Sequence, residues 1–125
     1  MVLVEKELTE PVVGAAIEVH RRLGPGLLEG IYRKCLIHEL RLRGLRVQYE
    51  LPLVLDYKGL KLKNAYRLDL LVEGKVVVEL KAVQRVEPVF KAQTLTYMRL
   101  QGAPVGLLIN FHVDVLRDGV TRLLL

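Results

Sequence analysis

The first third of the chain spaces its apolar residues as two amphipathic helices do. Thr9, followed by an acid and a proline, predicts a helix start, and this helix should run to about Leu23. Gly24-Pro25-Gly26 interrupts the pattern, and a second helix is expected over residues 27–43 with Gly44 as its cap. The pattern therefore predicts a pair of helices ahead of any strand.

The middle of the chain changes to the period of β-strands. Apolar and polar residues alternate over residues 46–57, which predicts a half-buried strand with an edge position or a bulge at Pro52. Two further strands rich in Leu and Val follow, and they meet near Glu73-Gly74. Because no helix separates these strands, this part of the sheet is expected to be antiparallel.

The last third returns to a helix and a buried strand. Pro88 predicts the start of a third helix that runs to about Leu100, and the apolar run over residues 105–111 is typical of a buried strand parallel to an earlier one. Asp118-Gly119 predicts a last hairpin between residues 113–116 and 120–125. The predicted fold class is α/β, a mixed β-sheet flanked by helices in the order ααβββαβ with a C-terminal hairpin.

Three charged residues lie in the most apolar part of the sequence, Asp69, Glu79 and Lys81. Buried charges need compensation, and alternation places Glu79 and Lys81 on one strand face. The face of Asp69 depends on the turn: a two-residue turn at Glu73-Gly74 turns it away, whereas a three-residue loop over residues 72–74 opposes it to Val77 and makes Glu79 its diagonal neighbour. Two converging carboxylates can bind Mg²⁺ or Mn²⁺, and the ammonium can act on a water molecule. The alternative is an ordinary Glu-Lys surface pair.

Other candidate residues lie on the predicted helices, and each has an alternative. His20 is either a hydrogen-bonded core histidine or an imidazole near a metal pocket. Glu29, with Tyr32 one turn later, is either a dipole-stabilising acid or a further carboxylate of the site. Gln93 and Tyr97 share a helix face and either pack against the sheet or present an amide and a phenol to a phosphate or to a metal-bound water. The polar side of the second helix is expected to be a solvated face, with Arg33, Lys34, Arg41 and Arg43.

Composition narrows the class of protein. The 125 residues are 51% hydrophobic, which fits one domain over residues 1–125 and excludes a disordered chain. Because no apolar run reaches the length of a membrane span and the N-terminus lacks a secretion signal, we expect a cytoplasmic protein. The net charge of +5 is compatible with a nucleic acid partner, with Arg85 and Lys91, and also Lys75 and Arg99, as candidate phosphate contacts.

The ordered set Asp69, Glu79-Leu80-Lys81 and Gln93-x-x-x-Tyr97 resembles the PD-(D/E)XK nuclease superfamily, in particular its RecB-like branch. The segment Gly26-Leu-Leu-Glu29-Gly-Ile-Tyr32 is similar to the signature of the small bacterial GxxExxY proteins. This resemblance covers nearly the whole chain and includes His20 and Asn110-Phe111. Leu68 stands where the superfamily name has proline.

The resemblance implies a restriction-endonuclease-like core with a divalent metal held by Asp69, Glu79 and the Leu80 carbonyl. It further implies that Lys81 acts on the attacking water, that Glu29 supplements the metal site, and that Gln93 and Tyr97 orient the nucleic acid or the lysine. We therefore expect a Mg²⁺- or Mn²⁺-dependent nuclease that cleaves DNA with little sequence specificity, and homodimerisation would extend its small binding surface. The alternative function is a catalytically silent module on the same scaffold that binds nucleic acid or protein.

Overall fold

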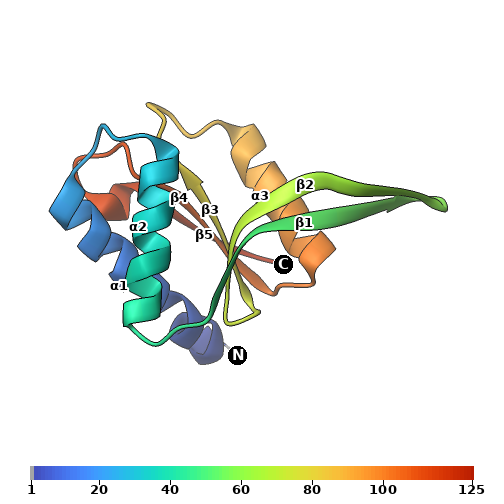
Figure 1. The fold of residues 1–125 in the computed structure, drawn as a ribbon, viewed down its shortest axis with the longest axis horizontal. Helices are drawn as coiled ribbons and strands as arrows, with labels where there is room; N and C mark the ends of the chain where they lie inside the picture. Colours follow the sequence, from blue (N-terminus) through green and yellow to red (C-terminus); the bar gives the residue numbers. More distant parts are fainter. Residues whose placement is uncertain (1) are drawn as a thin grey trace.

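The fold is an α/β arrangement of one five-stranded sheet and three α-helices, as predicted (Figure 1). The computed structural model describes residues 2–125. In chain order the elements are α1 (Val2–Leu23), α2 (Glu29–Leu42), β1 (Val47–Tyr57), β2 (Leu60–Val72), β3 (Val76–Lys81), α3 (Pro88–Gln101), β4 (Val105–Asn110), the 3-10 helix η1 (Leu116–Gly119) and β5 (Val120–Leu124).

The strands lie side by side in the order β1-β2-β3-β4-β5. Only β3 and β4 pair in parallel, with Lys81 opposite Asn110 at their C-terminal ends, and all other pairs are antiparallel. The parallel pair follows from the helix α3 between the two strands, because a crossover helix returns the chain to the same end of the sheet. The prediction that the apolar run after α3 is a buried parallel strand is therefore confirmed.

Helices cover both faces of the sheet. One apolar layer joins α1 and α2 to the sheet and contains Leu36, Leu70, Val78 and Leu80. The other lies under α3 and contains Leu71, Val77 and Met98. In Figure 1, α1 and α2 lie on one side of the strands and α3 on the other. The alternation of β3 therefore points Val78 and Leu80 to the helical pair, and Val77 and Glu79 to the α3 side.

The alternation of β2 is interrupted at Asp69. Leu68 and Leu71 pack in the same layer under α3 although they are three residues apart, which a regular strand does not allow. On the neighbouring strand β1, Glu50 adopts a left-handed backbone with φ of 51°. The alternation of faces is therefore broken beside Asp69, at the point where the pairing of β2 with β3 ends.

The outer parts of β1 and β2 extend beyond the rest of the sheet. They form a two-stranded projection (Figure 1), because β3 pairs only with residues 70–72 of β2. We call residues 52–67 the arm. β1 is an edge strand, which confirms the edge position predicted at Pro52, and a register shift follows between Leu53 and Leu55.

Two predicted boundaries are wrong. The first helix begins at Val2, and Thr9 lies inside it with its hydroxyl directed at the Lys6 carbonyl rather than capping the helix. The last hairpin does not form between residues 113–116 and 120–125, because β5 pairs with β4 from Leu124 opposite Val105 to Val120 opposite Ile109. The exposed edge of β4 offers β5 a full ladder, which a short local hairpin does not. Among the described helices, none combines the length and the hydropathy that crossing a bilayer requires.

Candidate active site

The turn between β2 and β3 brings the two central carboxylates together. The loop has three residues, as the convergence of Asp69 and Glu79 requires, but it comprises residues 73–75 rather than 72–74. Leu70 pairs with Val78, so the next pair along the ladder places Asp69 opposite Glu79 and not opposite Val77. The one-residue difference arises because Glu73 joins Gly74 in the left-handed region, with φ of 54° and 66°.

Arg46 holds this loop from outside the hairpin. The N–H of Glu73 donates to the Arg46 carbonyl (2.9 Å), and the N–H of Arg46 donates to the Glu73 carboxylate (2.6 Å). The hydrogen bond from the Arg46 N–H to the carboxylate lowers the pKa of Glu73, the Arg46 side chain lowers it further, and burial acts in the opposite direction. The reciprocal bonding supports the positive φ of Glu73 and, through it, the register of the strands.

Each central carboxylate bonds to the opposite strand. Glu79 Oε1 accepts a hydrogen bond from the Asp69 N–H (3.0 Å), and Asp69 Oδ2 accepts one from the Leu80 N–H (3.0 Å). The two side chains thus take the place of ladder hydrogen bonds where β2 and β3 separate. Each bond uses one carboxylate oxygen; the second oxygen of Glu79 is left for another ligand, and the second oxygen of Asp69, Oδ1, lies 3.7 Å from the Arg33 guanidinium.

The electrostatics of this pair are unfavourable without a cation. Glu79 is only 6% exposed, and its burial, followed by the charge of Asp69, raises its pKa to about 9. The pKa of Glu29 is also raised, first by burial and then by Asp69, while Lys81 and Arg33 act in the opposite direction. Glu29, the first residue of α2, therefore lies within electrostatic reach of Asp69 and Lys81.

Lys81 and α3 complete the surroundings of the pair. Lys81 follows Glu79 by two residues on the same strand face, and its Nζ lies 4.5 Å from the centre of the Phe90 ring. The Tyr97 ring lies 5.5 Å from that of Tyr66, and burial, followed by the charge of Glu79, raises the Tyr97 pKa. Gln93 lies one helical turn before Tyr97 and is partly exposed.

A family model described as the PD-(D/E)XK nuclease superfamily matches residues 6–123 of the chain. The chain belongs to this superfamily. No curated protein and no solved structure matches it significantly. Members of the PD-(D/E)XK superfamily generally use divalent metal ions, and the family supports nuclease activity and a nucleic acid substrate at the level of the superfamily.

The donor set of this PD-(D/E)XK chain fits a hard divalent cation through two carboxylates. Asp69 and Glu79 are neighbours whose mutual repulsion a cation would relieve, and carboxylate and main-chain oxygens are the ligands that Mg²⁺ and Mn²⁺ prefer. Among the side chains that the structure describes, those of residues 6–125, no group of three or more His, Cys, Asp or Glu is gathered as a metal site. Glu29 contributes negative charge near the pair, and its role as a supplementary carboxylate stays a prediction.

The segment Gly26-x-x-Glu29-x-x-Tyr32 has a clear structural basis. Gly26 has φ of 102°, which permits the bend before α2. The Tyr32 hydroxyl donates to the Gly24 carbonyl and accepts from the Leu27 N–H (3.1 Å), and its ring stacks on Phe111 at 4.6 Å. Buried Tyr32 thus anchors the loop that sets Glu29 at the start of α2.

His20 takes part in a different contact. Its Nε2 lies 2.8 Å from the Val113 carbonyl, and its ring lies 6.3 Å from Phe111. The buried imidazole joins α1 to the segment after β4. This geometry corresponds to the core histidine that was one of the two sequence interpretations.

Arg33 is the residue that the sequence interpretation placed wrongly. It was expected on a solvated face, but its guanidinium lies 3.7 Å from Asp69 Oδ1 and 3.5 Å from Glu50 Oε1, with 23% of its side chain exposed. Arg33 follows Glu29 by four residues and therefore lies on the same helix face. That spacing is the signal that could have placed it beside the carboxylates.

Asn110 supports the strand end that carries Lys81. Its side chain donates to the Val83 carbonyl (2.8 Å) and accepts from the Val83 N–H (3.0 Å), while the Phe111 N–H donates to the Lys81 carbonyl (2.9 Å). Asn110 is 3% exposed. These bonds fix the main chain of Lys81 and the start of the connector that follows it.

Arg85 and Lys91, the candidate phosphate contacts, are exposed. Arg85 forms an ion pair with Glu87 at 3.5 Å, and Lys91 lies on α3. A phosphate role for either residue stays a prediction.

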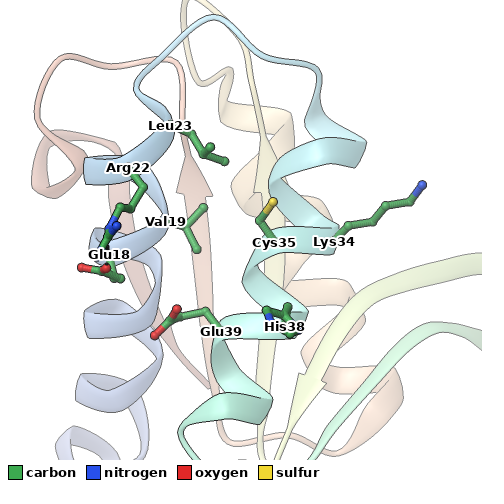
Figure 2. A pocket seen from close by; sticks show the side chains of 8 residues that line it. All are labelled: Glu18, Val19, Arg22, Leu23, Lys34, Cys35, His38 and Glu39. Carbon is green, nitrogen blue, oxygen red and sulfur yellow. Dashed lines mark hydrogen bonds and ion pairs between the residues drawn. The ribbon is translucent and has the colours of Figure 1, made fainter.

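A groove between two helices lies away from the carboxylates. It measures about 470 Å³ and opens between α1 and α2, where Val19, Leu23, Cys35 and His38 are among its lining residues (Figure 2). Asp69, Glu79 and Lys81 do not line it. The candidate chemistry is therefore located at the separated ends of β2 and β3 and not in this groove.

Proposed function

We propose that the protein is a Mg²⁺- or Mn²⁺-dependent nuclease that hydrolyses phosphodiester bonds of DNA with little sequence specificity. We place it in the RecB-like branch, among the GxxExxY proteins, and in the cytoplasm, as a single nuclease domain. The observation that carries the activity is a pair of hydrogen bonds where β2 and β3 separate, from the Asp69 N–H to the Glu79 carboxylate and from the Leu80 N–H to the Asp69 carboxylate, with Lys81 on the face of Glu79.

The metal ligands in this proposal are Asp69, Glu79 and the Leu80 carbonyl, with Glu29 as a supplementary carboxylate. A divalent cation at this position would supply Lewis-acid polarisation of the phosphate. Burial of Glu79 supports the assignment, since the raised pKa of Glu79 shows how poorly the pair tolerates two negative charges alone.

The catalytic residues in this proposal are Lys81, Gln93 and Tyr97. Lys81 orients the attacking water or stabilises developing charge, and its packing on Phe90 limits the positions of the ammonium. Gln93 and Tyr97 orient the nucleic acid strand from α3. His20 and Tyr32 act as secondary, positioning residues, since one joins α1 to the segment after β4 and the other anchors the loop before Glu29.

Binding is proposed to rely on the phosphate backbone. Arg85 and Lys91 lie on exposed positions after β3 and on α3, where they can contact phosphates. A homodimer would enlarge the contact surface of this small domain.

One observation favours the silent-module alternative. Arg33 already forms an ion pair with Asp69, so its guanidinium can supply positive charge at the position where a nuclease would require a metal ion. A module of this kind would bind nucleic acid without cleaving it.

The experiment that separates the two functions is cleavage of labelled single- and double-stranded DNA with Mg²⁺, Mn²⁺ or EDTA. If the protein is a nuclease, cleavage should require the divalent cation and should be lost in Lys81→Ala and Asp69→Asn. Lys34→Ala is the matched control, since Lys34 is exposed and lines the α1–α2 groove. DNA binding by the wild-type protein without cleavage under any of these conditions would refute the nuclease and support the module.

A further inference from the structure

Beyond its base, where Leu53 is buried under α3 and Tyr66 contacts Tyr97, the arm, residues 52–67, lacks the cover that the rest of the sheet has. Its two strands pair with each other, whereas the pairing of β2 with β3 ends at Leu70 (Figure 1). An isolated two-stranded hairpin is of marginal stability in water, because it has little apolar area to bury. An exposed ribbon of this length therefore requires a functional explanation.

The two faces of the arm differ in chemistry. Leu55 pairs with Leu62 and Tyr57 with Leu60, so these four side chains share one face, while Asp56 pairs with Lys61 on the other. Tyr57 is 62% exposed and Leu60 is 59% exposed. One face of the arm is thus apolar and open to solvent, and the other face carries charged groups.

The charge of the arm is strongly positive. It carries Lys58, Lys61, Lys63 and Arg67 against the single acid Asp56, a net charge of +3 in a chain whose net charge is +5. The Asp56 carboxylate also accepts a hydrogen bond from the Gly59 N–H (2.9 Å) within the turn. The arm therefore concentrates positive charge on a small part of the surface and complements a polyanion.

The arm continues directly into the candidate active site. At its base, the Tyr66 ring lies 5.5 Å from Tyr97. Arg67 lies 3.9 Å from Glu50, which pairs with Arg33, which in turn pairs with Asp69. A chain of contacts thus connects the base of the arm with the carboxylates.

We propose that the arm binds the single-stranded part of a nucleic acid whose scissile bond lies at Asp69 and Glu79. Unpaired bases stack on Tyr57 and Tyr66 and contact the leucines between them, while the lysines contact the phosphates. This inference rests on the proposed function, which supplies the class of partner, a nucleic acid, and places the scissile bond at the base of the arm. Charge disfavours a second copy of the chain as the occupant, because two arms of net charge +3 repel each other.

The test measures binding of the full chain to fluorescein-labelled oligothymidylate of about 16 nucleotides in EDTA, by anisotropy across a salt series. Lys61→Ala/Lys63→Ala should weaken binding and reduce the slope of log affinity against log salt by about 1.4, because two phosphate contacts to a single strand are lost. Tyr57→Ala should weaken binding by roughly tenfold and leave the slope unchanged, because a stacking contact carries no counterion release.

Lys34→Ala/Arg117→Ala is the control of equal charge, with both residues exposed and outside the arm. Its salt slope should remain that of the wild type. Equal affinity and slope for the arm variants and this control would overturn the inference. So would a wild-type dimer, measured by light scattering, that Leu60→Ser dissociates without any change in DNA affinity.

The binding assay contains no metal and does not depend on catalysis. Weaker binding by the arm variants together with an inactive wild-type protein would refute the nuclease and retain the arm inference. Metal-dependent cleavage together with unchanged binding by the arm variants would support the nuclease and refute the arm inference.

Discussion

The two ends of β2 contrast more sharply than any other regions of the molecule. The inner end, residues 69–72, lies between β1 and β3, and Leu70 and Val72 are buried. The outer end pairs with β1 alone, and Leu60 and Leu62 are exposed. The same leucine-rich pattern thus builds a core at one end of the strand and an exposed apolar face at the other. Neighbouring strands, and not residue type, decide which of these a leucine serves.

The largest difference is expected between two lysines, one at the carboxylates and one on the arm. Lys81→Ala should lower the rate of DNA cleavage by about a thousandfold, the upper range for loss of one charge-stabilising group in an active site. Lys61→Ala should lower it only a few-fold at low substrate concentration, because a single phosphate contact contributes mainly to binding. Single-turnover cleavage at saturating DNA measures only the effect of Lys81→Ala on the chemical step, because binding is then complete. Equal losses of cleavage rate in the two variants under these conditions would contradict the distinction between the two ends of β2.

Matched leucine truncations test the same contrast in stability. Leu70→Ala should lower the free energy of unfolding by about 2–5 kcal/mol, since Leu70 is fully buried and leaves a cavity. Leu62→Ala, at 42% exposure, should change it by less than about 1 kcal/mol. Urea denaturation of both variants measures these values, and a large loss in Leu62→Ala would mean that the arm is covered in solution.

The pH dependence of stability sharpens the description of the inner end. The folded-state pKa of Glu79, about 9, lies above its unfolded value of 4.5. Folded protein therefore retains a proton that unfolded protein loses between these values, and the stabilisation present below pH 4.5 is lost as the pH rises through about 9.

Glu79→Gln keeps the oxygen that accepts from the Asp69 N–H and removes this dependence. At pH 8 in EDTA it should be more stable than the wild type by on the order of 1–3 kcal/mol. Thermal unfolding between pH 5 and 9 provides the measurement. If the stability of the two proteins changed with pH in the same way, the pKa of Glu79 would not be raised. Added Mg²⁺ should stabilise the wild type more than the variant, because Glu79→Gln removes a proposed metal ligand.

The smallest effect concerns the anchor of the loop before α2. Tyr32→Phe keeps the ring on Phe111 but removes the hydroxyl that bonds Gly24 and Leu27, at a cost of about 1 kcal/mol in unfolding free energy. Because the loop places Glu29, metal affinity should fall more than it does in Tyr57→Phe, the control on the exposed arm. Calorimetric Mg²⁺ titration compares the two, and equal affinities would separate Tyr32 from the site.

Local patterns determined much of this protein from sequence. The order of helices and strands, the parallel pairing after α3 and the common face of Glu79 and Lys81 follow from helical and strand periods, from Pro88 and from the lack of a helix between the first three strands. These features depend on residues close together in sequence, so the sequence contains the information in readable form.

Tertiary structure decided the remainder. Arg46 fixes the loop after β2 from 27 positions earlier in the chain, and a shift of one residue there changes the partner of Asp69 from Val77 to Glu79. The ion pair of Arg33 with Asp69 and the pairing of β5 with β4 likewise join distant segments. Register and long-range pairing depend on contacts between segments that are separated in sequence. The periodicity of one segment predicts its own helix or strand but does not identify the residues that it contacts.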